Sequence, residues 1–147
     1  MAKLPLNNCN KDNTIKGIEN LGELLRQMSP RLEPDSFSFL SFPDAGYGDY
    51  AYLCPVASIL EKEGITLVVA RVIALGHGFE DTTPFSRITL TVHSSLTAVG
   101  LTAAVSNALA SQGISVNVIA GFYHDYLYVP QVDGERALAL LHELTRT

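Results

Sequence analysis

Cysteine is scarce in this chain, and long apolar segments are missing from it. Cys9 and Cys54 are the only two cysteines among 147 residues, too few for a disulfide scaffold, so we expect reduced thiols. No apolar run approaches the roughly 20 residues that a membrane-spanning helix needs. The first residues, MAKLPLNNCNKDN, show no apolar core of a signal peptide. These absences predict a cytoplasmic protein that does not enter a membrane.

Charged residues are also sparse, and their balance is acidic. They make up 17% of the chain, the formal net charge is −5, and 47% of the residues are hydrophobic. A chain that binds a phosphate backbone normally carries a basic stripe, so we expect no nucleic-acid partner. High hydrophobicity with low charge favours a globular protein over a disordered one. At this length, one compact unit of two subdomains is the natural size.

Sequence motifs for catalysis and for metal or cofactor binding are not found. The four histidines and the scattered carboxylates show no HxH, HExxH or paired CxxC spacing. The glycine-containing segments GYGDYA and GHGFED lack the spacing of dinucleotide- and phosphate-binding loops. Cys54 stands beside a proline with no evident base, which is typical of an inert buried thiol. We therefore expect no cofactor, no metal and no enzymatic activity.

The clearest pattern in the chain runs from Ser86 to Pro130. Residues 86–93 alternate as a strand, and a helix follows that Gly113 ends. Residues 114–120 and 126–129 give two more strands. Asp133 can cap a last helix. The apolar stripes of the two helices are Leu101, Val105, Ala108 and Leu109, and then Ala137, Leu138, Leu141 and Leu144. The order β-α-β-β-α is five of the six elements of a ferredoxin-like βαββαβ unit.

The first half of the chain predicts a complementary set of elements. The first is a helix that starts at Asn13 or Thr14, with Ile18, Leu21, Leu25 and Met28 on its apolar stripe. Two strands follow, over Ser36–Phe42 and Tyr50–Cys54. A helix over Pro55–Glu63 and a buried strand over Ile65–Leu75 complete the set. This order lacks a first strand, as the second half lacks a last one. We predict an α+β fold with two ferredoxin-like halves, residues 1–75 and 86–147, joined by a connector at 76–85. Antiparallel sheets should carry the helices on one face.

Two segments of the second half resemble a known family. LTVHSSLTAVGLTAAVS and AGFYHDYLYVP are similar to the corresponding segments of ACT domains, in particular those of small bacterial ACT-like proteins built from two tandem halves. The arginine sensors of animal nutrient signalling are more distantly similar. The resemblance covers residues 65–145 well and residues 1–64 thinly. It implies a fold that senses small molecules, often amino acids.

The loop before the second-half helix is the first candidate site. Gly100 near the helix start favours close packing, or it leaves space for a ligand to reach free N–H groups of residues 95–101. Ser94 and Ser95 are helix caps, or they add hydroxyl donors beside those N–H groups. The resemblance implies ligand contacts in this loop, and the residues concerned are Ser94, Ser95, Leu96, Val99, Gly100 and Leu101.

The turn Phe122-Tyr123-His124-Asp125 is the second candidate. Polar residues in a turn need no ligand, but the resemblance implies that Asp125 meets the amino group of a ligand. Phe122 and Tyr123 would then cover its side chain. Arg71 is the only charge in the run ITLVVARVIAL, where it either extends to water or binds a carboxylate.

Two functions remain open for this chain. One is a regulatory module that binds a small molecule, with an amino acid as the leading ligand class. The other is an assembly module that pairs with a second chain and needs no ligand. We also expect a homodimer, because Thr89 and Thr91 give one strand face that is too polar for a core and poor in charge.

Overall fold

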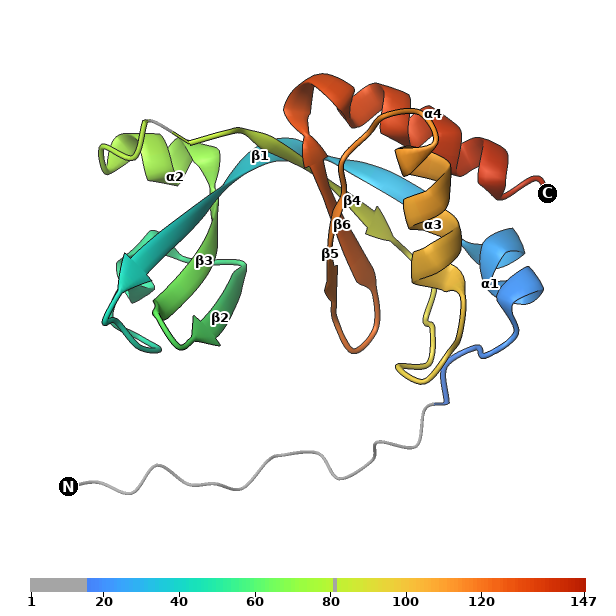
Figure 1. Cartoon of the computed structure of the whole chain (residues 1–147), viewed down its shortest axis with the longest axis horizontal. Helices are drawn as coiled ribbons and strands as arrows, with labels where there is room; N and C mark the ends of the chain where they lie inside the picture. Colours follow the sequence, from blue (N-terminus) through green and yellow to red (C-terminus); the bar gives the residue numbers. More distant parts are fainter. Residues whose placement is uncertain (1–15, 81) are drawn as a thin grey trace.

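Six antiparallel strands form one sheet in the computed structural model of this chain, which describes residues 16–80 and 82–147. The strand order across the sheet is β2-β3-β1-β4-β6-β5 (Figure 1). The strands are β1 (Pro30–Pro43), β2 (Ala57–Glu61), β3 (Gly64–Ala70), β4 (Phe85–Leu90), β5 (Asn117–Ala120) and β6 (Asp125–Pro130).

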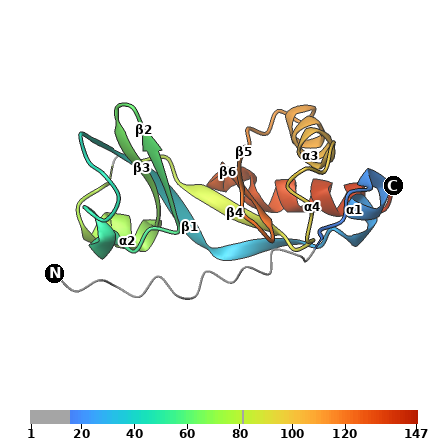
Figure 2. The same ribbon diagram turned by 90° about the horizontal axis from the view of Figure 1, so that it is seen from below.

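The helices of the described residues lie on one face of this sheet. They are α1 (Leu21–Gln27), α2 (Arg71–Gly76), α3 (Leu101–Ala110) and α4 (Gly134–Leu144), with two short 3-10 helices, η1 (Ala51–Leu53) and η2 (Gln131–Asp133). Figure 2 shows α2 at one end of the molecule with β2 and β3, and α1, α3 and α4 gathered at the other end. The predicted α+β fold, with antiparallel strands and helices on one face, is confirmed.

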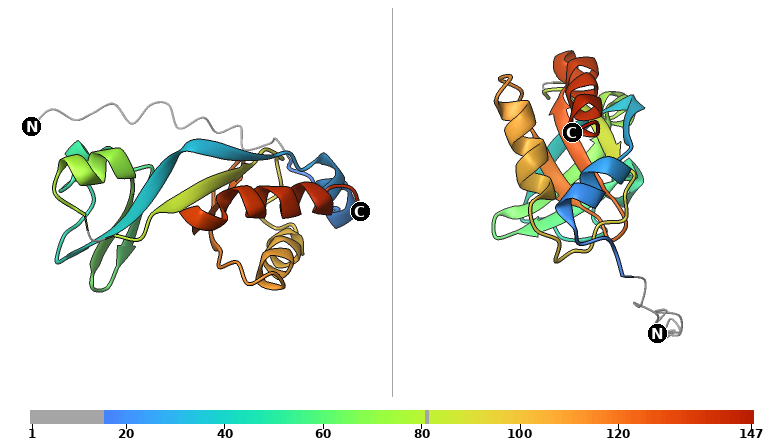
Figure 3. Two further views of the ribbon diagram at one scale, coloured as in Figure 1. Left: turned by 90° about the horizontal axis from the view of Figure 1, so that it is seen from above. Right: turned by 90° about the vertical axis from the view of Figure 1, so that its right-hand side faces the viewer.

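Strand β1 joins the two ends of the molecule. Its residues 37–43 pair with β3, and its residues 30–37 pair with β4, with a shift of register between Leu32 and Ser36. The left view of Figure 3 shows this long strand running between both ends. The second half consists of β4, α3, β5, β6 and α4, and β1 supplies the last strand that this half lacks. Strand β1 also serves as the first strand of a unit β1-η1-β2-β3-α2-β4.

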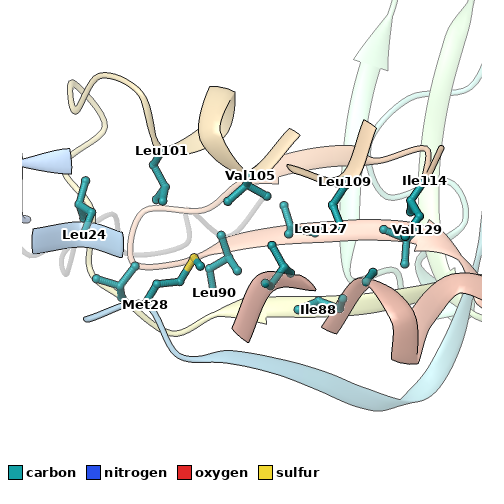
Figure 4. Packing of buried hydrophobic residues seen from close by; sticks show 13 residues of the cluster. Leu24, Met28, Ile88, Leu90, Leu101, Val105, Leu109, Ile114, Leu127 and Val129 are labelled. Carbon is teal, nitrogen blue, oxygen red and sulfur yellow. The ribbon is translucent and has the colours of Figure 1, made fainter. Parts of the chain in front are cut away.

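The largest hydrophobic core lies between the sheet and the helices of the second half. Figure 4 shows Leu101, Val105 and Leu109 of α3 in one core with Leu127 and Val129 of β6 and Ile88 and Leu90 of β4. Leu24 of α1 and Met28 just after it pack into the same core. Helix α1 thus covers the second half, although the division of the sequence at residue 75 would group it with the first.

Three elements predicted in the first half are wrong. The strand over Tyr50–Cys54 is the 3-10 helix η1, the helix over Pro55–Glu63 is the strand β2, and the strand over Ile65–Leu75 ends at Ala70, where α2 begins. Strand β2 lies at the edge of the sheet and is mostly exposed, so it shows no alternation of buried and exposed residues. A continuous apolar run by itself does not separate a buried strand from a buried helix.

Smaller corrections concern caps, ends and one thiol. The first helix is capped by Asn20, whose Oδ1 accepts the N–H of Glu23 at 3.0 Å, and the predicted caps Asn13 and Thr14 lie outside the described residues. Asp133 pairs with Arg136 at 3.2 Å and makes no side-chain cap. The predicted strands over 86–93 and 114–120 are shorter, as β4 and β5. Cys54 is exposed rather than buried, and Cys9 lies outside the described residues.

Candidate functional site

The loop from Val92 to Gly100 and the residue Asp125 lie side by side at one edge of the second half. Asp125 is the first residue of β6 and pairs with Leu90, the last residue of β4. The chain leaves β4 at this point to form the loop that leads into α3. Antiparallel pairing therefore places the start of β6 beside the loop that follows β4 (Figure 1).

A small hollow of about 80 Å³ separates Asp125 from the start of α3. The first two residues of that helix, Leu101 and Thr102, belong to its wall. N–H groups in the first turn of a helix have no carbonyl partner within the helix and carry a partial positive charge. The hollow thus lies between a carboxylate and a set of backbone donors. Its full lining is Ser94, Ser95, Leu96, Ala98, Leu101, Thr102, Ala120 and Asp125.

Burial raises the pKa of Asp125 above its usual value of 3.8, while the hydroxyl of Ser94 and the positive charge of His124 act in the opposite direction. The carboxyl group is thus partly withdrawn from water, and no ion pair joins it to a basic side chain of the described residues. His124 is itself unusual, since its Nδ1 is buried and has no hydrogen-bond partner among those residues. An acid in this setting is suited to receive a cationic group from a ligand.

The raised pKa gives a prediction about stability and pH. The protonated form of Asp125 stabilises the fold, and this contribution is present below pH 3.8 and is lost as the pH rises through the higher pKa of the folded state. We therefore expect Asp125→Asn to be more stable than the parent at neutral pH. The gain should stay below about 1 kcal/mol, because the group is half-buried and water screens it. Urea unfolding at neutral pH and below pH 3.8 measures it.

The difference in unfolding free energy between Asp125→Asn and the parent should disappear in acid, where both side chains are neutral. The control is Glu63→Gln in the exposed turn between β2 and β3, which should leave the stability unchanged at either pH. A variant Asp125→Asn that is less stable than the parent at neutral pH would contradict the argument.

The segment before α1 holds the site loop in place. The N–H of Ile18 donates to the carbonyl of His93 at 2.9 Å, and the N–H of Ser95 donates to the carbonyl of Ile18 at 3.0 Å. Gly17 lies so close that a Cβ there would be 2.7 Å from the carbonyl oxygen of Ser94. The loop is therefore bonded to a segment that lies about 75 residues earlier in the chain.

These bonds correct one part of the predicted site. The sequence predicts free N–H groups in residues 95–101, yet Ser95 donates to Ile18, Thr97 to the hydroxyl of Ser95, and Ala98 to the carbonyl of Ser95. Among the described residues, no such bond is made by the N–H groups of Leu96, Val99, Gly100 and Leu101, the last of which begins α3. Gly100 has a φ of 107° and precedes α3 without a side-chain cap, and a Cβ there would lie 2.9 Å from Leu21. Gly100 thus packs closely against α1, and its predicted contact with a ligand stays a prediction.

The structure brings most of the predicted residues together. Ser94, Ser95, Leu96, Leu101 and Asp125 line the hollow. Phe122 and Tyr123 lie with His93 in an aromatic cluster, where the ring of His93 is 5.2 Å from Tyr123 and 6.1 Å from Phe122. Val99, by contrast, is 83% exposed.

Arg71, which the sequence also offered as a ligand contact, lies far from this cluster in the fold. It is the first residue of α2, at the opposite end of the sheet. Its Nη1 donates to the carbonyl of Thr82 at 2.8 Å and lies 3.4 Å from the hydroxyl of Ser38. It therefore fastens the connector between the halves to β1.

Several lining residues were not identified from the sequence. Lys16 and Gly17 come from the segment before α1, and nothing local in the sequence links that segment to the loop about 75 residues later. Ala98, Thr102 and Ala120 are small residues without a distinctive pattern. The sequence predicts His93 on the polar face of a strand, but that strand ends at Leu90.

At the corresponding place in the first half, a glycine stands where the second half has the acid. Gly64 is at the start of β3 and pairs with the last residue of β1, as Asp125 is at the start of β6 and pairs with the last residue of β4. Near it, Tyr50 stacks on Phe42 with ring centroids 3.7 Å apart, and Leu53 is fully buried. Within the described residues, the loop-and-acid arrangement therefore occurs in the second half alone.

These observations define the class of protein: two ferredoxin-like units that share the strands of one antiparallel sheet, with a loop-and-acid site on the second. The chain belongs to the ACT-domain family. The family's sequence profiles, both described as ACT domain, match residues 16–86 and 84–143. The suggested relation to arginine sensors stays a prediction.

Solved structures agree with this assignment. The chain is 48% identical to a Vibrio cholerae protein of unknown function described as a possible transport protein, over 81% of this chain and 91% of that one, with a TM-score of 0.74. It is 13% identical to the ligand-free regulatory subunit of aspartate kinase from Thermus thermophilus, over 78% of this chain and 95% of that one, with a TM-score of 0.55. The second likeness shows the fold alone. No curated protein matches this chain at a significant level.

Membrane spans and metal-binding groups are both absent from residues 16–80 and 82–147. None of the helices in these ranges is long and apolar enough to cross a membrane. The histidines, cysteines and carboxylates of the same ranges form no group of three or more that could hold a metal ion.

Proposed function

We propose that this protein is a regulatory module that binds a small molecule, and that its ligand is an amino acid. The observation that carries the proposal is the hollow of about 80 Å³ between Asp125 and the first turn of α3. The carboxylate suits an ammonium group, and the helix N-terminus suits a carboxylate. An amino acid presents both groups on one carbon atom. A ligand at this loop would contact both α3 and β6, since residues of each line the hollow.

The known family supports the same proposal. Two ACT domains cover residues 16–143, and regulatory subunits of aspartate kinase share the fold. The residues proposed to contact the ligand are Ser94, Ser95, Leu96, Leu101, Thr102 and Asp125, with Phe122 and Tyr123 beside them. The expectations that the protein is cytoplasmic and is not an enzyme stay predictions.

Calorimetry against the twenty amino acids tests the proposal. We expect at least one of them to bind, and Asp125→Ala to weaken that binding at least tenfold, because a hydrogen bond to a charged group contributes about 1.5–3 kcal/mol. The unfolding free energy should change little, since a half-buried carboxylate contributes little to the core. The matched control is Glu63→Ala in the corresponding turn of the first half, which should bind as the parent does.

A second candidate function has one observation in its favour. Large apolar side chains around the site are exposed, namely Leu96 at 67%, Val99 at 83%, Phe122 at 42% and Tyr123 at 54%. Such a cluster is typical of a surface that docks another chain. If no amino acid binds, an assembly module becomes the better description.

We also propose that the protein is a homodimer, through this apolar surface rather than through the threonine face. Thr89 is buried and donates to Glu33 at 2.8 Å, and Thr91 donates to the carbonyl of Ser29, so neither hydroxyl is free for a partner. Light scattering should give about twice the 15.9 kDa mass of one chain. Leu96→Asp should reduce that mass toward one chain if the surface is correct.

A further inference from the structure

A second hollow, of about 220 Å³, adjoins the one that holds Asp125. Ser94, Ser95 and Leu96 belong to the walls of both hollows. The remaining walls come from the segment before α1, from the start of the loop that follows β4 and from the turn between β5 and β6. Those wall residues are Lys16, Gly17, His93 and Phe122. A ligand held at Asp125 thus has this hollow as the neighbouring space for its side chain.

The two hollows differ in charge. The carboxylate of Asp125 lines the smaller one. Among the described residues no acid lines the larger one, whose charged group is the ammonium of Lys16. The wall also includes His93, Ser94 and Ser95. The hydroxyl of Ser94 bonds Asp125 and that of Ser95 pairs with Thr97, so the imidazole of His93 is the further donor for an oxygen anion. The rest of the wall includes the apolar Leu96 and the ring of Phe122.

The position of Lys16 is set by the backbone around it. Gly17 lies against the backbone of Ser94 and Ser95, where any Cβ would overlap the amide of Ser95. The next residue, Ile18, both donates hydrogen bonds to this loop and accepts them from it. Residues 17 and 18 are held against the loop that carries the site. The lysine just before them therefore lies at the edge of the hollow. A role in packing does not require a lysine at this place.

We propose that the larger hollow receives an anionic side chain, so that the ligand is an amino acid with an acidic side chain, and that Lys16 is the residue that selects it. The inference rests on the proposed function and names the ligand class of the same site. The ammonium group of the ligand lies at Asp125, its α-carboxylate at the first turn of α3, and its side-chain anion at Lys16. A basic side chain would instead place two cations in one hollow. The side-chain anion is a carboxylate or a phosphate, and the choice of ligands below separates the two.

Calorimetry on the full chain with matched pairs of ligands tests the inference. The probes are L-aspartate and L-glutamate against their amides L-asparagine and L-glutamine, with O-phospho-L-serine against L-serine. In at least one pair, we expect the acid to bind about fivefold or more tightly than its neutral partner. Higher salt should weaken the binding of the acid and leave that of the neutral partner unchanged. A preference confined to phosphoserine identifies a phosphate, and one confined to aspartate or glutamate identifies a carboxylate.

The variant Lys16→Gln decides whether the lysine is responsible. It should remove the preference by weakening the acid about fivefold, while the neutral partner binds within about twofold of its parent affinity. The matched control is Lys62→Gln in the exposed turn between β2 and β3, which should retain the preference. Retention of the preference in Lys16→Gln would overturn the role of the lysine.

Failure of this inference is distinguishable from failure of the proposed function. If neutral amino acids bind as tightly as acidic ones and Asp125→Ala still removes binding, the regulatory site stands and the acidic ligand class is wrong. If none of the twenty amino acids nor phosphoserine binds, both are wrong. Because Lys16 is exposed, its replacement should leave the urea unfolding curve unchanged, and a loss of binding cannot then come from unfolding.

Discussion

Gly64→Ala is expected to lower the free energy of unfolding by about 3 kcal/mol or more. Gly64 has a φ of 147°, a conformation that residues with a side chain rarely adopt. A Cβ at this place would overlap the carbonyl oxygen of Phe42 and lie 2.8 Å from the Cα of Pro43. Both belong to the end of β1 that pairs with β3, where Pro43 is the partner of Gly64 itself, so making room for the Cβ would disturb that pairing. Urea unfolding measures the loss.

The matched control is Gly46→Ala in the loop after β1. A Cβ added at Gly46 would meet no atom within 4 Å, and the φ of this residue is not positive. Its N–H donates to Asp49 at 2.8 Å, a bond that alanine retains. We expect this variant to stay within about 0.5 kcal/mol of the parent. A loss below about 1 kcal/mol for Gly64→Ala would show that the edge of β1 can adjust, contrary to the argument.

Leu24→Ala is expected to lower the free energy of unfolding by about 2–5 kcal/mol. Leu24 is fully buried in the core that also contains α3 and α4. Removing its side chain leaves a cavity between α1 and α3, which contact each other there. The loss would show that α1, encoded in the first part of the chain, stabilises the second half. Urea unfolding with a single transition measures it.

Leu60→Ala provides the control for Leu24→Ala. Leu60 lies on the edge strand β2 and is 54% exposed, so its replacement should cost less than about 1 kcal/mol. If the two variants lose similar amounts of stability, α1 is not part of the core of the second half. The same result would weaken the view that the segment before α1 holds the site loop, because α1 anchors that segment.

The second half was predictable because its signals are local. Strand β4 alternates buried and half-buried residues at its start, and α3 and α4 each carry an apolar stripe at helical spacing. The acid Asp125 was found from a resemblance in HDYLYVP, and the fold does place it beside Ser94 and the start of α3. In the first half, the helix over Pro55–Glu63 was predicted from Pro55 at its start and Gly64 at its end, which carry no information about burial. The apolar Ile59 and Leu60 lie exposed there, on an edge strand.

The sequence by itself determined the type and order of the elements from Phe85 onward, since hydrophobic spacing and the glycines that end helices act within a few residues. The tertiary structure decided which strand completes each unit and which distant segment packs against the loop that follows β4. Strand β1 completes both units because its two ends pair with different partners, β3 and β4. The loop after β4 is held by backbone bonds to Ile18, which lies about 75 residues earlier in the chain, and Lys16 next to this segment lines the adjoining hollow. Pairing at that separation leaves no periodicity in the sequence, because it depends on which edges and faces remain open once the local elements have formed.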